Sequence, residues 1–353
     1  MTHDDTLLGV RAFRLTEDGR TLLLLDQRAL PGEERWLEIR EVEALAQSIE
    51  SLAVRGAPAI ACAAALGLAA CVHGFADDPV AFRGQAEAAL ERLAHTRPTA
   101  VNLFVALREL REALAALPAG ASAAALRDRI REVAEAHTQR ELESCLAMAG
   151  HGAALMPEAG GVLTHCNTGA LATAGVGTAL GVIRRACADG KRLRIFADET
   201  RPVLQGARLT AWELHRDGIP VEVIADNMAG FLMSRGEIKA AIVGADRIAR
   251  NGDVANKIGT YSVAVLCRHH GVPFYVAAPW TTIDASLADG AAIPIEERDH
   301  LEIHVHGDRR MTPIGVGARN PAFDVTPAGL VDRYVTERGL FTADELRAAL
   351  AAE

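Results

Sequence analysis

The stretch Thr164-His165-Cys166-Asn167-Thr168-Gly169 places a thiol where a strand is expected to end. It follows the short apolar run Val162-Leu163 and precedes a segment of small residues from Ala170 to Gly181. This order predicts a buried strand, a tight turn and a helix. Ligands bind at the carboxyl ends of the strands in an open parallel α/β sheet, so Cys166 is a candidate for chemistry.

Asp246 is the second candidate, because it follows the apolar segment 240–243 within Gly244-Ala245-Asp246. If the strands take the doubly wound order 3-2-1-4-5, the first and fourth strands are neighbours and Cys166 faces Asp246 across a crevice. A free cysteine is usually a small buried apolar residue, and an aspartate is usually a cap. The positions of both at strand ends favour a functional role.

Polar residues follow other expected strands. Asp198-Glu199-Thr200-Arg201-Pro202, with Gln205-Gly206 after it, is typical of the rim of a polar site, although a salt-bridged helix start explains it about as well. Asn251-Gly252 predicts a turn. Asn256-Lys257 is then expected to open a helix, where the dipole and a side-chain charge together favour an anion.

Two arginines precede expected helices in the first half of the chain. Arg55 stands in Arg55-Gly56-Ala57-Pro58, and Arg97 stands directly before Pro98. Proline is tolerated in the first helical turn, and the free N–H groups there bind anions. Each motif alone is explained by a turn between helices, but the two together favour a phosphate pocket.

The elements that must position these residues fall into two parts. Up to about residue 150 the pattern predicts helices after a hairpin centred on Asp18-Gly19. From about residue 160, strands and helices alternate, which predicts right-handed crossovers and a parallel sheet. We expect helices at 41–51, 78–95, 122–155, 169–188, 204–216, 228–235 and 256–270, and strands at 161–166, 193–197, 221–225, 240–243 and 273–277. A last helix is expected after Asp324-Val325-Thr326-Pro327, with Thr326 as its N-cap.

Two further motifs are interpreted as structural. Gly175-Val176-Gly177 with Gly181 is similar to a dinucleotide fingerprint, and Asp198 could be its ribose-binding acid. Those glycines must form the strand-to-helix turn itself, whereas here they fall inside the expected helix, so close helix–sheet packing explains them better. His304-Val305-His306 has alternate-residue spacing on an expected strand, and we interpret it as structural and not as metal-binding.

Composition limits the class of protein. The net charge of −9 argues against a binder of nucleic acid or of anionic membranes. The polar start lacks the apolar core of a signal peptide, and the apolar run 60–72 is short for a membrane span. The six scattered cysteines fit reduced thiols, so we expect a cytoplasmic protein.

Nine motifs in the same order resemble the family of methylthioribose-1-phosphate isomerases, which also contains ribose-1,5-bisphosphate isomerases and regulatory subunits of a translation-initiation exchange factor. The resemblance covers nearly the whole chain. The motifs are Arg55-Gly56-Ala57-Pro58-Ala59, Thr96-Arg97-Pro98-Thr99-Ala100-Val101-Asn102, Thr164-His165-Cys166-Asn167-Thr168-Gly169, Asp198-Glu199-Thr200-Arg201-Pro202, Gln205-Gly206-Ala207-Arg208-Leu209-Thr210, Asp226-Asn227-Met228, Gly244-Ala245-Asp246-Arg247, Asn256-Lys257-Ile258-Gly259-Thr260 and Asn320-Pro321-Ala322-Phe323-Asp324-Val325-Thr326-Pro327.

The resemblance implies a fold, a site and a reaction. The fold is an α/β one, with a mostly helical N-terminal domain that holds a small sheet (1–150) and a Rossmann-like parallel-sheet domain (151–353) that binds no nucleotide. A homodimer without metal or other cofactor is implied. Cys166 and Asp246 are implied as the catalytic pair, and the substrate contacts are Arg55, Gly56, Ala57, Arg97, Gln205, Asn256 and Lys257.

The implied reaction turns an aldose 1-phosphate into a ketose 1-phosphate in methionine salvage. Asp246 is expected to protonate the ring oxygen, and Cys166 either takes the C2 proton as a thiolate or stabilises a direct hydride shift. One alternative is an isomerase of another phosphorylated pentose, such as ribose 1,5-bisphosphate or 5-deoxyribose 1-phosphate. The other is a non-catalytic subunit that senses a sugar phosphate or nucleotide, against which the presence of both Cys166 and Asp246 argues.

Overall fold

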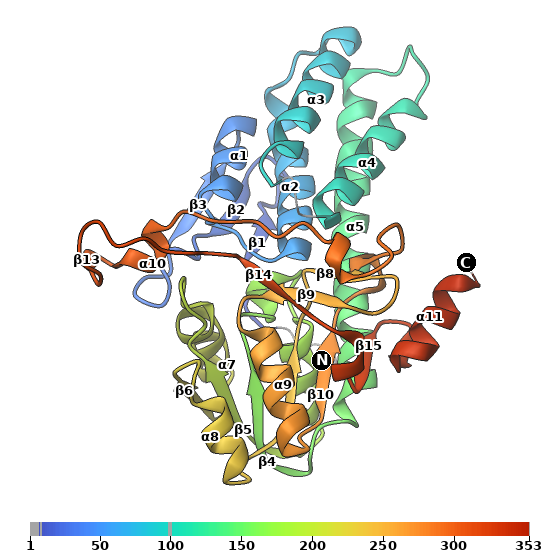
Figure 1. Ribbon diagram of the computed structural model, residues 1–353. Coiled ribbons are helices and arrows are strands. Elements are labelled where there is room, and N and C mark those ends of the chain that lie inside the picture. Colours follow the sequence, from blue (N-terminus) through green and yellow to red (C-terminus); the bar gives the residue numbers. More distant parts are fainter. Residues whose placement is uncertain (1–6, 8, 98–100, 353) are drawn as a thin grey trace. The chain divides into compact units, whose positions relative to one another are not determined.

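The computed structural model describes residue 7, residues 9–97 and residues 101–352 (Figure 1). The chain divides into two compact units, and the division falls within one long helix, after Leu146. Residues 169–177 belong to the first unit although they follow part of the second in sequence. The two domains expected at 1–150 and 151–353 therefore stay a prediction. Each unit is described by itself.

The first unit combines a small antiparallel sheet with helices. The expected hairpin is confirmed: β1 pairs with β2 around a turn in which Asp18 Oδ1 accepts from the Arg20 amide at 3.0 Å. A third strand, β3, was not predicted and extends this sheet. The elements of the first unit are β1 (Phe13–Leu15), β2 (Leu22–Leu25), β3 (Trp36–Ile39), α1 (Val42–Glu50), α2 (Ala57–Cys71), α3 (Pro79–Ala94), α4 (Val101–Ala115) and the greater part of α5 (Ala123–Ala153).

Helix α2 is the core of this unit, because every residue from Ala59 to Cys71 is buried. A helix that is apolar on all sides needs such surroundings. Residues 57–74 are the one segment of the described chain long and apolar enough to cross a membrane, but 78% of the segment is buried inside the fold. Burial of this kind is typical of a core helix.

The second unit is built on a seven-stranded sheet with the order β16-β15-β10-β7-β4-β5-β6. The five expected strands are confirmed, and their order is the predicted 3-2-1-4-5, so β4 and β7 are neighbours. All pairs are parallel except β15 with β16. The strands are β4 (Ala159–Thr164), β5 (Arg192–Asp198), β6 (Val221–Ile224), β7 (Ile238–Val243), β10 (Phe274–Ala277), β15 (Arg333–Thr336) and β16 (Gly339–Phe341).

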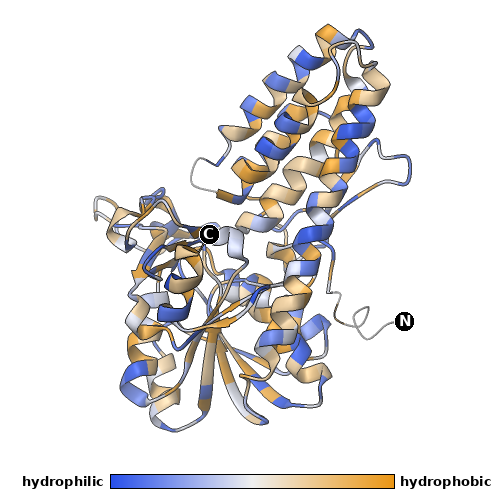
Figure 2. Ribbon diagram, turned by 90° about the vertical axis from the view of Figure 1, so that its right-hand side faces the viewer, coloured by the Kyte–Doolittle hydropathy of each residue, from blue (hydrophilic) through white to orange (hydrophobic). Residues whose placement is uncertain are grey.

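Helical crossovers make this sheet parallel, because each returns the chain to the edge where the previous strand began. They are α6 (Ala179–Ala188), a π-helical turn (Gly206–Thr210) continued by α7 (Ala211–Arg216), α8 (Ala229–Ser234) and α9 (Thr260–His270). The sheet strands are mostly apolar (Figure 2). Leu163, Phe196, Val243 and Val276 are among their residues in the core between sheet and helices.

The expected helix 169–188 is wrong in its first half, since α6 begins only at Ala179. Residues 170–172 form one short 3-10 turn. Gly175 and Gly177 lie in the loop before α6 with φ of 140° and 96°, values that favour glycine. Backbone conformation, and not helix–sheet packing, therefore explains these glycines. The connection from β4 to α6 is still a long excursion, unlike the tight turn of a dinucleotide motif.

A second, four-stranded sheet in this unit was not predicted. Its order is β11-β8-β9-β14, and β9 and β14 pair antiparallel over a long sequence separation. Its strands are β8 (Arg247–Ala249), β9 (Val254–Lys257), β11 (Ile283–Asp284) and β14 (Phe323–Thr326). Asn256 and Lys257 consequently lie on a strand and do not open a helix.

The end of the chain also differs from the prediction. Thr326 ends β14 and does not cap the last helix. That helix is α11 (Ala343–Ala351), which Thr342 and Glu345 cap reciprocally. Between β11 and β14 the chain forms α10 (Leu301–His304), β12 (Val305–His306) and β13 (Arg309–Arg310). His304 is buried, and its Nδ1 lies 2.6 Å from Thr312 Oγ1.

Candidate active site

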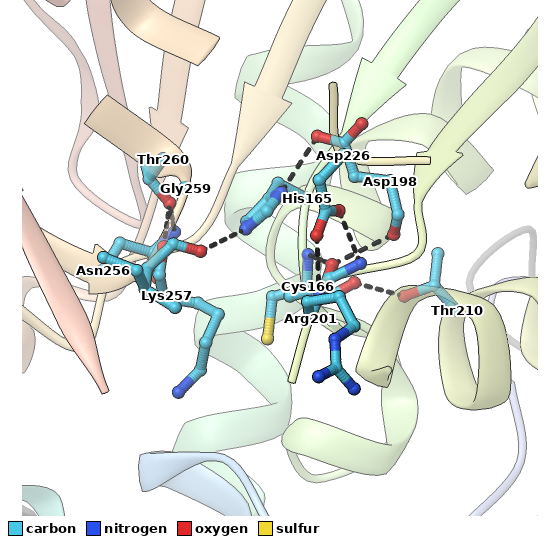
Figure 3. Close-up of polar contacts among 12 residues, drawn as sticks. His165, Cys166, Asp198, Arg201, Thr210, Asp226, Asn256, Lys257, Gly259 and Thr260 are labelled. Carbon is cyan, nitrogen blue, oxygen red and sulfur yellow. Dashed lines mark hydrogen bonds and ion pairs between the residues drawn. The ribbon is translucent and has the colours of Figure 1, made fainter. Parts of the chain in front are cut away.

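Cys166 lies just beyond β4 with a positive φ of 65°. Its amide donates to Thr200 Oγ1 at 2.8 Å, and its carbonyl accepts from Thr210 Oγ1 at 2.6 Å (Figure 3). A residue other than glycine in this conformation costs about 1–3 kcal/mol and persists where its surroundings fix it, often at functional sites. The half-buried thiol therefore stands on a turn held on both sides.

The loop after β5 supplies one of these two hydrogen bonds, through Thr200. Thr200 also has a positive φ, of 63°. The amides of Thr200 and Arg201 each donate to one carboxylate oxygen of Asp226 at 2.7 Å (Figure 3). Asp226 follows β6, so the end of the third strand shapes the loop that holds Cys166. The sequence motif containing Asp226 carried no hint of this supporting role.

His165 and Asp198 form a buried pair behind Cys166. His165 Nδ1 lies 2.9 Å from Asp198 Oδ2, and its Nε2 lies 2.8 Å from the carbonyl oxygen of Ile258 (Figure 3). The His165 side chain is 1% exposed and that of Asp198 is fully buried. Asp198 is therefore internal and does not belong to the rim of the site.

His165, Asp198 and Asp226 also have the composition of a metal site. A metal ion needs a lone pair on the imidazole, but both ring nitrogens already face hydrogen-bond partners. Both oxygens of Asp226 accept backbone amides. The chemistry of this group is that of a hydrogen-bonded network.

Asp246 lies beyond β7, the strand next to β4. Leu163 of β4 pairs in parallel with Ala241 of β7, so the segments that follow the two strands leave the sheet at the same edge. A Cβ on Gly244 would meet Thr168 Cγ2 at 2.8 Å, so these extensions approach closely. Cys166 and Asp246 thus leave the carboxyl ends of neighbouring parallel strands, the arrangement expected at a topological switch point.

Asn256 and Lys257 are joined to Asp246 through the small sheet. The Asp246 amide donates to the Ala255 carbonyl of β9 at 2.9 Å. Asn256 and Lys257 follow on the same strand and are 4% and 8% exposed. Lys257 Nζ donates to the Ala322 carbonyl at 2.8 Å and lies 4.6 Å above the Phe323 ring. The ammonium group of a buried lysine in this position can bind an anionic group of a substrate.

The start of α9 is already occupied, which corrects the expectation of an anion there. Asp324 of β14 accepts from the amides of Gly259 and Tyr261, at 2.7 and 3.1 Å. Burial raises the pKa of Asp324, and these two backbone hydrogen bonds oppose that shift. Any charge offered to substrate here comes from the Lys257 side chain and not from the helix dipole.

Gln205 and Gly206 begin the π-helical turn after β5. Gln205 is buried, and Gly206 packs directly on the backbone of Asp198. Thr210, at the end of this turn, holds the Cys166 carbonyl. Asn167 Nδ2 donates to Glu213 Oε1 at 2.8 Å, and Glu213 pairs with the buried Arg184. The second unit thus places Cys166, Gln205 and Asp246 beyond the ends of β4, β5 and β7, and Asn256 and Lys257 on β9.

Arg55, Gly56, Ala57 and Arg97 belong to the first unit. Gly56 is the N-cap of α2 with φ 87°, and a Cβ there would lie 2.5 Å from the Ala172 carbonyl oxygen. Pro58 stands in the first turn, as expected. Arg97 follows α3, but the helix start expected at Pro98 lies outside the described residues.

A doubly wound sheet whose strand ends carry a thiol and carboxylates, with a buried lysine on the small sheet beside it, is typical of an α/β protein that acts on small molecules. The chain belongs to the initiation factor 2 subunit family, whose model matches residues 53–343. It is 56% identical to the methylthioribose-1-phosphate isomerase of Syntrophotalea carbinolica, over 92% of this chain and 94% of that one.

Solved structures agree with this assignment. The 5-methylthioribose 1-phosphate isomerase of Pyrococcus horikoshii superposes with a TM-score of 0.93 at 41% identity, over 99% of this chain and 98% of that one. A translation initiation factor eIF-2B subunit delta from A. fulgidus superposes with a TM-score of 0.85 at 43% identity, over 94% and 96% of the two chains. The expected family and fold are confirmed.

Proposed function

We propose that this chain is the aldose–ketose isomerase that converts 5-methylthioribose 1-phosphate to 5-methylthioribulose 1-phosphate in methionine salvage. The observation that carries the proposal is the 52–56% identity to methylthioribose-1-phosphate isomerases over more than nine-tenths of this chain. The positions of Cys166 and Asp246 beyond adjacent strands support it. The steps proposed below use only acid, base and anion-binding side chains.

The proposed mechanism begins with ring opening. Phosphate on the anomeric oxygen prevents the spontaneous opening of a free sugar, so the bond between C1 and the ring oxygen breaks only as that oxygen gains a proton. Asp246 in its protonated form donates this proton. The ring oxygen becomes the C4 hydroxyl, and C1 becomes electron-poor.

Hydrogen must then move from C2 to C1. In one route the Cys166 thiolate removes the C2 proton, an enol phosphate forms between C1 and C2, and C1 is reprotonated as the C2 hydroxyl becomes a ketone. In the other, C2 hydrogen moves to C1 as hydride while the C2 hydroxyl loses its proton, and Cys166 stabilises the transition state. In the first route the Cys166 thiol returns its proton to C1. In both, the Asp246 carboxylate takes the proton that the C2 hydroxyl loses, so the acid is regenerated and the atoms balance without an external oxidant or reductant.

The proposed substrate contacts are Gln205, Asn256 and Lys257 in the second unit and Arg55, Gly56, Ala57 and Arg97 in the first. Burial of Asn256 and Lys257 supports the former group. We further propose a homodimer in the cytoplasm that uses no metal or other cofactor, as the family resemblance implies. The net charge and scattered thiols are compatible with this location.

Purified protein is expected to convert methylthioribose 1-phosphate without added metal, at a rate that a chelator leaves unchanged. The reason is that the proposed steps use only side-chain acid, base and charge. Product formation followed by NMR, with ribose 1,5-bisphosphate and 5-deoxyribose 1-phosphate as competing substrates, measures this. Loss of activity on chelation and its return with metal would overturn the cofactor statement. No turnover of any of the three would favour the alternative of a non-catalytic regulatory subunit.

Lys257→Met and Arg97→Ala are each expected to weaken substrate binding by about one to two decades, because a charge-assisted hydrogen bond is worth roughly 1.5–3 kcal/mol. Lys191→Met is the matched control, since Lys191 Nζ also donates to a backbone carbonyl, that of Met156 at 2.6 Å. Lys191 lies at the amino end of the sheet, beside the surface hollow at the starts of β5 and β6. If calorimetry finds the same substrate affinity in all three variants and in the wild type, Arg97 and Lys257 do not bind the phosphate and the proposed phosphate pocket is wrong.

A further inference from the structure

The side chain of His165 bridges three segments of the second unit, in addition to the sheet pairing of β4 with β5. It stands at the end of β4, next to Cys166. Its Nδ1 faces Asp198 at the end of β5, and its Nε2 faces the Ile258 carbonyl, directly after Asn256-Lys257 on β9 (Figure 3). A Cβ on Gly259 would lie 2.8 Å from the imidazole Cε1, so glycine at that position lets the turn pack against the ring.

The two partners of the ring fix how many protons the pair holds. A carbonyl oxygen only accepts, so Nε2 must carry a hydrogen. Nδ1 then faces a carboxylate oxygen at 2.9 Å, and a proton must lie between them for this contact to be attractive. The proton sits either on the ring or on Asp198, and in both cases the pair has no net charge. The other oxygen of Asp198 is buried and has no hydrogen-bond partner among the described residues, which disfavours an uncompensated carboxylate.

We propose that His165 is a positioning residue that, by sharing one buried proton with Asp198, ties the Cys166 turn to the Ile258 turn and so sets Cys166 against Asn256 and Lys257. This inference deepens the proposed function and rests on it for the roles of these three residues. It assigns His165 no contact with substrate. Loss of the shared proton would set a nitrogen lone pair against a carboxylate and loosen both turns.

The charges around the pair agree with retention of the proton. Burial of His165 lowers its pKa, but the hydrogen bond and charge of Asp198, the Ile258 carbonyl and Asp226 outweigh it, so the pKa of His165 is raised. Burial raises the pKa of Asp198, with Asp226 and Glu199 adding to the shift and His165 opposing it. The Asp324 carboxyl also interacts with His165. Both shifts favour the protonated pair.

The sign of the pH effect follows. Above the ordinary histidine pKa of about 6.5, the unfolded chain has released this proton and the folded chain still holds it. Its contribution to stability is complete below about pH 6.5 and is lost as pH rises through the raised folded value. Unfolding of the wild type between these values is therefore expected to release one proton more than unfolding of Asp198→Asn. In that variant an amide NH₂ can donate to Nδ1 of a neutral ring, which keeps both contacts without the extra proton.

Two substitutions of His165 separate its two contacts. The amide of His165→Asn falls near the Nδ1 position and can still reach Asp198, whereas that of His165→Gln falls near Nε2 and can still reach Ile258. We expect His165→Gln chiefly to lower kcat, through Cys166, and His165→Asn chiefly to raise KM, through Asn256 and Lys257. Each effect should be about tenfold to a hundredfold, the size expected for small misplacements of reacting groups. Asp198→Asn should stay within a few-fold of wild type.

A readout independent of turnover keeps the inference separate from the proposed function. Alkylation of Cys166 by iodoacetamide, followed by peptide mass spectrometry with the half-buried Cys187 as internal reference, reports the Cys166 turn directly. A Cys166-to-Cys187 ratio that changes several-fold in His165→Gln but not in Asp198→Asn supports the inference, even if the wild type proves inactive on the proposed substrate. Unchanged ratios and unchanged kcat and KM in both folded His165 variants overturn the positioning role. Equal proton release from wild type and Asp198→Asn overturns the shared proton.

Discussion

Replacing Asp246 with asparagine is expected to lower turnover of methylthioribose 1-phosphate by about 10²–10⁴-fold while substrate still binds. The change is nearly isosteric, and the Asp246 backbone amide keeps its hydrogen bond to Ala255. Asparagine cannot donate and recover a proton as a carboxylic acid does. Cys166→Ser is expected to lose turnover to a similar extent if the thiolate is the base, because a serine hydroxyl is far less acidic.

The controls for this pair lie at the other end of the sheet. Cys187 and Asp189 end α6 and are half-buried and exposed, respectively, so Cys187→Ser and Asp189→Asn should leave kcat unchanged. Single-turnover kinetics and calorimetric affinity separate loss of chemistry from loss of binding. If Asp246→Asn and Cys166→Ser both keep turnover within a few-fold, the strand ends are only structural. If Cys166→Ser alone stays active, direct hydride movement with Asp246 as acid becomes the better mechanism.

The large sheet could be predicted because its signals are local. Apolar runs of strand length alternate with helical segments, and this alternation is sufficient for a parallel order with β4 beside β7. Cys166 and Asp246 directly follow two of those runs, so their placement at strand ends followed from the same reasoning. The predicted arrangement depended on a common strand order that this chain adopts.

The small sheet could not be predicted, because its strands pair across distant sequence. Asn256 and Lys257 stand before a helical stretch, and local patterns place them at its start. Pairing with Phe323 and Asp324 makes them strand residues instead. The same pairing explains why Thr326, although followed by proline, ends a strand. Tertiary contacts decided both cases over local propensity.

The supports of Cys166 were also invisible in the sequence. Thr200 and Thr210 are common residues, and nothing in their spacing indicates that one would hold the amide and the other the carbonyl of the same cysteine. Asp226 lies 26 residues from Thr200 in the chain and still determines the conformation of its loop. Charged motifs near strand ends were therefore sufficient to predict where the site lies. Which of their residues face the site and which support it from behind could be seen only in the structure.

Gly206 is the position where one added methyl group should disturb this support most. A Cβ built there would lie 1.7 Å from the carbonyl oxygen of Asp198 and 3.0 Å from Thr200 Oγ1. The first clash is with backbone, which no rotamer change relieves. Asp198 holds His165, and Thr200 holds the Cys166 amide, so displacement of the β5 end reaches the candidate site through both.

Gly206→Ala is accordingly expected to lower the free energy of unfolding by about 3 kcal/mol or more, which is a large effect for a single substitution. The fraction of the variant that remains folded is expected to have a lower turnover. The denaturant midpoint, with an unchanged slope, measures the stability change. Gly150→Ala is the matched control, because Gly150 lies in helix α5 and a Cβ there meets nothing within 4 Å. Alanine at this helical position should be neutral or stabilise by up to about 1 kcal/mol. A Gly206→Ala protein within about 1 kcal/mol of wild type, with unchanged kcat, would show that β5 can move without cost and that its contacts do not position Cys166.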